Sequence, residues 1–281
     1  MISRRCFMKG AAITAAALVA ADLPSAHAGE LTGSIKKAVK YGMIRGRLSV
    51  HEKMALLKKL GFDGVEPGVG DKVEPAELKE AAAAAGIAIH GVVNGSVDNI
   101  PRAIDRAVFY GASSVLLVAG RVNESMSYEK NYGVTQDIIR AAIPYAFEKG
   151  IMLLVENVWN NFLLSPLEMA RYIDELESDT LGVYFDIGNV VRFGWPEHWI
   201  RTLGTRIKKL DIKEYSREKQ NDEGLWKGFD VKIGEGSVDW AAVRTELKAL
   251  NYKGWGTAEV SGGEEDRLAD ISARMDRVLD L

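Results

Sequence analysis

The chain has 281 residues, of which 47% are hydrophobic and 27% are charged, and its formal net charge is −3 at pH 7. This composition excludes a disordered, collagen-like or disulfide-scaffold chain. A mildly acidic chain with no basic stripe also does not favour nucleic acid as a partner. The single cysteine, Cys6, lies near the N-terminus, so a processed chain would have neither a disulfide nor a cysteine nucleophile.

The first 28 residues have the pattern of an export signal. Arg4 and Arg5 form a twin-arginine pair, and the apolar run 10–21 that follows is too short to span a bilayer. Ala26-His27-Ala28 then supplies the small residues that a signal peptidase recognises. The sequence predicts a twin-arginine signal peptide over residues 1–28, a mature protein over 29–281, and a periplasmic or secreted location. No other stretch is long enough to predict a membrane span.

From residue 36 onward, short apolar runs alternate with amphipathic stretches. Near-continuous apolar runs are typical of parallel strands that are buried on both faces. The expected strands are Val39–Ile44, Gly64–Glu66, Ile87–Val93, Ser114–Ala119, Ile151–Glu156, Leu181–Asp186, Arg206–Ile212 and Gly254–Val260. Eight strand–helix units in about 250 residues predict a single-domain (β/α)8 TIM barrel. The alternative is a doubly wound open sheet, which usually has a glycine-rich turn after its first strand, and the segment 41–45 is not such a turn.

Helix signals lie between the expected strands. Ser165 and Glu168 predict a capping box, with Pro166 at the first helical position. Ser237 is expected to cap the next-to-last helix. The spacing of apolar residues predicts a final helix over Glu264–Leu281.

Acidic residues close the last four expected strands. They are Glu156, Asp186, Asp211 and Glu259. Because barrel active sites form at the C-terminal ends of strands, these carboxylates are expected to converge. Four converging anions would repel one another unless they took up protons or shared a divalent cation, and oxygen ligands favour Mg²⁺ or Mn²⁺. The alternative is that each acid caps a helix or pairs with a lysine, with Lys213 as the expected partner of Asp211.

Several motifs resemble those of a known family. They are Gly61–Glu66, Glu156-Asn157, Asp186–Asn189 and Gly234–Trp240. Across nearly the whole mature chain, the sequence resembles the xylose isomerase-like barrels of the sugar phosphate isomerase/epimerase family, which includes ketose 3-epimerases and hydroxypyruvate isomerase. The resemblance implies that Glu156, Asp186 and Glu259 ligate a divalent metal. Asp211 stands where relatives usually have a histidine ligand, which implies an all-carboxylate site for Mn²⁺ or Mg²⁺.

Substrate-binding candidates lie near the same strand ends. They are Asn189, Arg217, Lys213, His90, Trp159 and Phe162. The first two match substrate-contacting positions in relatives, and the two aromatic residues follow Glu156, where they would stack on a sugar ring. Packing of the aromatic rings onto the barrel rim, and a hydrogen-bonded strand position for the histidine, are the alternatives.

By analogy with the family, one glutamate removes the proton next to the carbonyl of a keto sugar, and a second acid returns it to the enediolate. Glu156 and Glu259 are the expected pair. Return to the same carbon epimerises the sugar and return to the neighbouring carbon isomerises it, and the sequence leaves both open. The predicted function is therefore that of an exported, divalent-metal-dependent sugar isomerase or epimerase.

Two alternative functions remain at this stage. The first is a 3-keto-glycoside lyase or hydrolase, which begins with the same proton abstraction and needs a wide cleft. The second is a non-catalytic sugar-binding barrel. Because phosphorylated sugars are mainly cytoplasmic, the export signal favours a neutral keto sugar or a 3-keto-glycoside as substrate. A homodimer is a further expectation, since dimers are common in this family.

Overall fold

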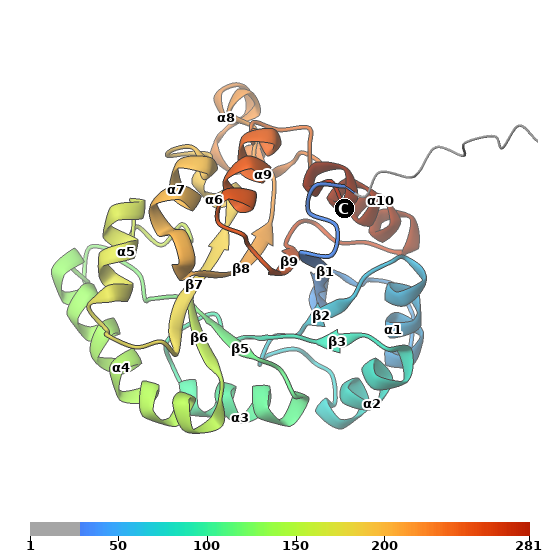
Figure 1. The fold of residues 1–281 in the computed structure, drawn as a ribbon, viewed down its shortest axis with the longest axis horizontal. Coiled ribbons are helices and arrows are strands. Elements are labelled where there is room, and N and C mark those ends of the chain that lie inside the picture. Colours follow the sequence, from blue (N-terminus) through green and yellow to red (C-terminus); the bar gives the residue numbers. More distant parts are fainter. Residues whose placement is uncertain (1–28) are drawn as a thin grey trace, which may run out of the picture.

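The computed structural model describes residues 29–281 (Figure 1), and the predicted signal peptide lies outside the described residues. Parallel strands form a nearly closed barrel in the order β3-β2-β1-β9-β8-β7-β6-β5-β4. The strands are β1 (Ile35–Lys40), β2 (Gly64–Glu66), β3 (Ala88–Ile89), β4 (Val92–Val93), β5 (Ser114–Leu117), β6 (Met152–Glu156), β7 (Leu181–Asp186), β8 (Ile207–Ile212) and β9 (Gly254–Ala258). Because β3 and β4 are two halves of one interrupted strand, the predicted (β/α)8 barrel is confirmed.

Helices surround the barrel on its outer side (Figure 1). They are α1 (Val50–Lys59), α2 (Pro75–Ala85), α3 (Ile100–Tyr110), α4 (Tyr128–Lys149), α5 (Pro166–Asp174), α6 (Ile187–Val190), α7 (Pro196–Leu203), α8 (Arg217–Glu223), α9 (Trp240–Ala249) and α10 (Glu265–Leu279). Three short 3₁₀ helices are η1 (Tyr41–Met43), η2 (Gly204–Arg206) and η3 (Leu225–Phe229). Within residues 29–281, no helix is both long and apolar enough to cross a membrane.

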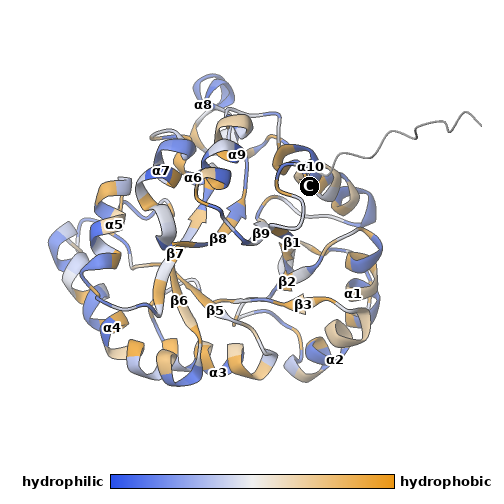
Figure 2. Cartoon of the chain, viewed as in Figure 1, coloured by the Kyte–Doolittle hydropathy of each residue, from blue (hydrophilic) through white to orange (hydrophobic). Residues whose placement is uncertain are grey.

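The core lies between the strands and the inner faces of the helices. Figure 2 shows hydrophobic strands such as β5 and β6, and hydrophilic outer faces on the surrounding helices. Val65, Leu153 and Val183 are completely buried, as expected for parallel strands covered on both sides. Each fully buried aliphatic side chain of this kind contributes about 1.5–3 kcal/mol to the free energy of unfolding.

The first strand lies earlier in the chain than predicted. It spans Ile35–Lys40 rather than Val39–Ile44, and the chain turns into η1 at Tyr41. The charged residues at its start gave no strand signal, yet Lys37 is buried, because its ammonium lies 2.9 Å from the Ser272 hydroxyl and 2.5 Å from an Asp276 carboxylate oxygen on α10. A lysine with both partners supplied by a neighbouring helix is compatible with a barrel strand.

Two cap predictions need correction. The Ser165 hydroxyl accepts the Glu168 N–H as expected, but the Glu168 carboxylate accepts the N–H of Leu164, so the expected reciprocal half of the capping box is wrong. The cap of α9 is Asp239, whose carboxylate accepts the Ala242 N–H, and not Ser237.

The predicted third strand, Ile87–Val93, is interrupted at His90 and Gly91. A Cβ atom on Gly91 would lie 2.2 Å from Glu66 Oε1, so this position approaches the completely buried Glu66 too closely for any side chain. Glu66 is held from other strands, by the Lys40 ammonium at 2.7 Å and by the Tyr184 hydroxyl at 2.9 Å. The break in the strand therefore makes room for a buried ionic group.

Gly91→Ala should destabilise the protein by about 1–3 kcal/mol, because the added methyl overpacks the space beside Glu66. Chemical denaturation would measure this change. The matched control is Gly133→Ala, since Gly133 lies inside α4 and a Cβ atom there would have no neighbour within 4 Å, and it should be neutral or slightly stabilising. Equal stability of the two variants would show that the third strand has more room than the structure indicates.

Candidate active site

The four acids predicted at the strand ends lie together. Glu156 and Asp186 end β6 and β7, Asp211 lies on β8, and Glu259 directly follows β9. One carboxylate oxygen from each lies within 4.8 Å of the corresponding oxygens of the other three. Asp186 pairs in register with Asp211 on the adjacent strand, which places the two side chains at the same height in the barrel. These four residues are called the acid cluster below.

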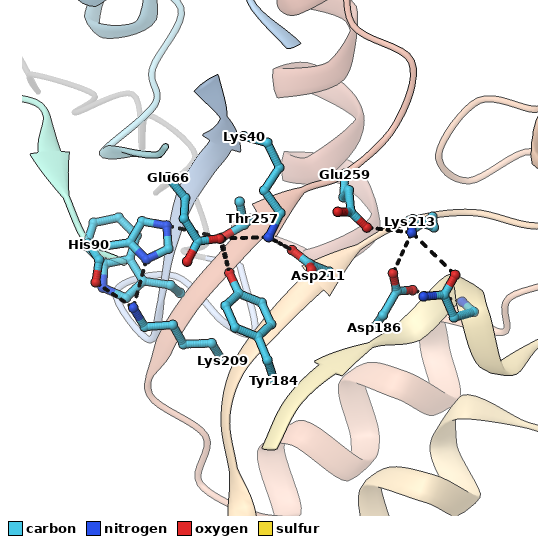
Figure 3. A network of polar contacts seen from close by, with 12 residues as sticks. Lys40, Glu66, His90, Tyr184, Asp186, Lys209, Asp211, Lys213, Thr257 and Glu259 are labelled. Carbon is cyan, nitrogen blue, oxygen red and sulfur yellow. Dashed lines mark hydrogen bonds and ion pairs between the residues drawn. The ribbon is translucent and has the colours of Figure 1, made fainter. Parts of the chain in front are cut away.

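Lys213 reaches into the acid cluster. Its ammonium lies 2.7 Å from Asp186 Oδ2 and 2.5 Å from Glu259 Oε2 (Figure 3). The expected pairing of Lys213 with Asp211 is therefore wrong. Lys213 directly follows β8, two residues after Asp211. Its long side chain extends to the acids at the ends of the two neighbouring strands, β7 and β9, instead.

The partner of Asp211 is Lys40, at the end of β1. The Lys40 ammonium lies 2.9 Å from Asp211 Oδ1 and also binds Glu66 (Figure 3). It sits 4.6 Å from the centre of the Tyr184 ring. No signal in the sequence points to Lys40, because the predicted first strand begins one residue before it and runs past it.

Burial and mutual repulsion shift the pKa values of the acids in the cluster. Burial, together with the charges of Glu259 and Asp211, raises the pKa of Glu156 well above its usual range. Burial raises the pKa of Asp186 to about 6, although Lys213 opposes this. Burial would also raise the pKa of Glu259, but Lys213 and Lys40 outweigh it and bring the pKa down to about 2. The lysines therefore neutralise only part of the cluster.

The acid cluster fits a divalent cation. Within residues 29–281, the buried Asp211 Oδ2 has neither a hydrogen bond nor an ion pair, and the buried Asp211 Oδ1 and Asp186 Oδ2 contact only the ammonium groups of Lys40 and Lys213. A buried carboxylate oxygen without a partner is unfavourable, and coordination of a hard cation would satisfy it. The all-oxygen donor set matches the preference of Mg²⁺ and Mn²⁺.

A reciprocal set of hydrogen bonds fixes the ends of β6 and β7. The Asn157 side chain donates to the Asp186 carbonyl and accepts the Asp186 N–H, both at 2.8 Å. The Asn189 side chain donates to the Asn157 carbonyl at 3.0 Å, while the Asn189 N–H donates to Asp186 Oδ1 at 2.8 Å. One carboxylate oxygen of Asp186 therefore accepts a hydrogen bond from the backbone of α6, and the other oxygen faces Lys213.

A cavity of about 810 Å³ opens above the acid cluster. Glu156 and Glu259 line it, together with three of the predicted substrate-binding residues, Lys213, Asn189 and Trp159. The Trp159 indole N–H donates to the Asn189 carbonyl at 2.8 Å, which fixes the ring at the cavity edge. Trp226 and Phe229 also line the cavity and were not identified from the sequence, because they lie in η3, a segment without a strand-end signal.

The other three predicted substrate-binding residues lie outside the cavity lining. His90 is buried inside the barrel, stacked on Trp255 at 4.4 Å, and burial and the nearby Lys209 lower its pKa well below the usual range. The Arg217 guanidinium donates to the carbonyls of Val191 and Gly194 at 2.9 and 2.6 Å. Phe162 is 1% exposed in an aromatic group with Tyr128, Tyr132 and Tyr172.

Lys213→Met should increase the affinity for Mn²⁺ by about tenfold or more, because a cation entering the cluster no longer has to displace the ammonium. The metal-free variant should lose about 3 kcal/mol of stability, because Asp186 and Glu259 lose their counter-ion. Calorimetric titration with Mn²⁺ and thermal unfolding in EDTA would measure the two effects.

The control is Lys248→Met, which removes only an exposed ion pair with Glu30 and should change neither quantity by more than about 1 kcal/mol. An unchanged Mn²⁺ affinity in Lys213→Met would show that Lys213 and the cation do not compete for one position.

The chain is similar to known proteins over most of its length. The chain is 24% identical over 254 aligned residues to a putative L-ribulose-5-phosphate 3-epimerase of Haemophilus influenzae, covering 79% of this chain and 88% of the relative. In solved structures, a D-allulose 3-epimerase from Methylomonas sp. superposes with a TM-score of 0.69 at 17% identity, covering 88% of this chain and 98% of that one. A 3-keto-D-glucoside 4-epimerase from E. coli superposes with a TM-score of 0.70 at 15% identity, covering 88% and 100%.

These two superpositions show the shared fold. The family profile described as xylose isomerase-like TIM barrel matches residues 54–278, which is most of the described chain. The chain belongs to the xylose isomerase-like TIM barrel family.

Proposed function

We propose that the protein is a sugar epimerase or isomerase in which one glutamate removes the proton next to the carbonyl of a keto sugar and a second glutamate returns a proton to the enediolate. The observation that carries this proposal is that Glu156 and Glu259 line the same cavity and share one acid cluster. Proton abstraction next to a carbonyl needs an acceptor and a donor, both within hydrogen-bond reach of the reacting carbon. The similarity to sugar 3-epimerases supports the same chemistry.

The four acids and Lys213 also have binding roles in this proposal. Glu156, Asp186, Asp211 and Glu259 would hold a divalent cation. A bound cation of this kind supplies Lewis-acid polarisation of the sugar carbonyl. Lys213, which contacts Asn189 Oδ1 at 3.3 Å as well as two acids, would bind a sugar oxygen once its ammonium turns toward the cavity.

A second candidate is a 3-keto-glycoside lyase or hydrolase. The volume of the cavity favours it, because about 810 Å³ is more than one sugar ring requires. Such a reaction starts with the same proton abstraction and ends with expulsion of the substituent at C1. Analysis of the products separates it from epimerisation and isomerisation.

The metal-loaded protein should introduce deuterium next to the carbonyl of a keto sugar in D₂O, and Glu156→Gln and Glu259→Gln should each lower this exchange by about 10²-fold or more. Mass spectrometry and NMR of a panel of keto sugars and 3-keto-glycosides would measure it. Glu124→Gln, at an exposed position outside the cavity, is the matched control. Exchange that survives both cavity substitutions contradicts the glutamate assignment, and a metal-loaded protein without any exchange would support the sugar-binding barrel.

We also propose that the chain is exported through the twin-arginine pathway, on the basis of the Arg4-Arg5 pair, the apolar run 10–21 and the small residues before residue 29. Replacing Arg4 and Arg5 together by lysine should retain the protein in the cytoplasm as the unprocessed chain. Fractionation of cells with an intact pathway would measure this. Equal export of the two forms would rule out this pathway.

A further inference from the structure

Three aromatic residues form one side of the main cavity, and they are called the aromatic wall here. Trp159 follows β6, and Trp226 and Phe229 belong to η3. The Trp159 ring centre lies 5.0 Å from that of Trp226 and 4.7 Å from that of Phe229. Trp226 is 67% exposed and lines the cavity, so much of its ring is available to a ligand there.

The aromatic wall is held rigidly in place. The Tyr215 hydroxyl donates to the Leu225 carbonyl at 2.7 Å, and the Ser216 N–H donates to the Gly228 carbonyl at 2.8 Å. A Cβ atom on Gly228 would lie 2.3 Å from the Tyr215 ring, so η3 rests directly on this side chain. The backbone that carries Trp226 and Phe229 is therefore fixed before any ligand arrives, which lowers the entropic cost of binding.

The aromatic wall begins beside the acid cluster. The Lys213 ammonium lies 5.6 Å from the Phe229 ring centre and 2.5 Å from Glu259 Oε2. A sugar with its carbonyl at the cluster would thus have its neighbouring substituent against these rings. Polar residues also line the cavity, among them Arg121, Asn160 and Asp230. An apolar face with polar groups around it is complementary to a pyranose ring, which has apolar faces and hydroxyls at its edge.

The cavity has room for a ligand larger than one sugar. Its volume of about 810 Å³ lies near the upper end of the range, about 300–1,000 Å³, in which drug-sized ligands are buried. A single hexose held at the acid cluster would not cover the exposed ring of Trp226. Covering that ring with a second sugar ring removes its apolar surface from water.

We propose that the aromatic wall is a subsite for a second pyranose ring, joined by a glycosidic bond to the keto sugar at the acid cluster. This inference rests on the proposed function and names its substrate class, a keto sugar within a glycoside rather than a free monosaccharide. Trp226 and Phe229 are its specificity-determining residues.

The test compares deuterium exchange by the metal-loaded enzyme on a methyl 3-keto-glucoside, a 3-keto-disaccharide and an aryl 3-keto-glucoside. The disaccharide should have a kcat/KM about tenfold or more above that of the methyl glycoside, mainly through a lower KM. Trp226→Ala should bring this ratio close to one. Trp195→Ala, which removes a 53% exposed tryptophan outside the cavity lining, should leave the ratio unchanged.

A ratio near one in the wild type, or a ratio unaffected by Trp226→Ala, would overturn the proposal. A preference for the aryl glycoside over the disaccharide would overturn the assignment of a pyranose and indicate an aromatic substituent. If deuterium enters none of the three substrates, the proposed function fails. Calorimetry with the unoxidised disaccharide then decides whether the subsite exists. Binding that Trp226→Ala weakens supports the subsite, whereas no binding in the wild type overturns it.

Discussion

Repulsion among four clustered carboxylates, three of them buried, is the constraint on which the rest of this barrel depends. Adjacent parallel strands in register place Asp186 and Asp211 side by side, and Glu156 and Glu259 complete the group. Like charges at this separation cannot all remain ionised in a buried site without compensation. The two lysines that supply it are Lys40, at the end of the neighbouring strand β1, and Lys213, which directly follows β8, the strand that carries Asp211.

The two lysines differ in their surroundings. Lys40 contacts Asp211, Glu66 and the Tyr184 ring, so these buried groups inside the barrel fix its position (Figure 3). Lys213 lines the cavity. Lys40 is therefore enclosed in the barrel, whereas Lys213 lies where the proposed cation or substrate would displace it.

Connected polar groups extend from the barrel interior to the cavity at its surface. The break in the strand at Gly91 leaves space for the Glu66 carboxylate. The Lys40 ammonium forms ion pairs with Glu66 and with Asp211. Above the acids, the amide side chain of Asn157 orients Asp186, and the aromatic wall continues the cavity outward. A site in which each charged group is fixed by the group below it is preorganised, which favours electrostatic catalysis.

The sequence by itself determined the barrel and the positions of the four acids, because both depend on local patterns. An apolar run that ends in an acid predicts a buried strand and a carboxylate at its C-terminal end, whichever residues surround it. Three of the residues that it proposed for substrate binding, Lys213, Asn189 and Trp159, line the cavity.

Only the tertiary structure decided which groups meet. Glu66 and Tyr184 are 118 residues apart in sequence, and their hydrogen bond exists because the barrel closes. For the same reason, the counter-ion of Asp211 is Lys40 rather than Lys213, Phe162 is buried in an aromatic cluster, and η3 carries Trp226 to the cavity. Periodicity reports the environment of a residue along its own element, whereas a side chain's partner depends on how distant elements pack.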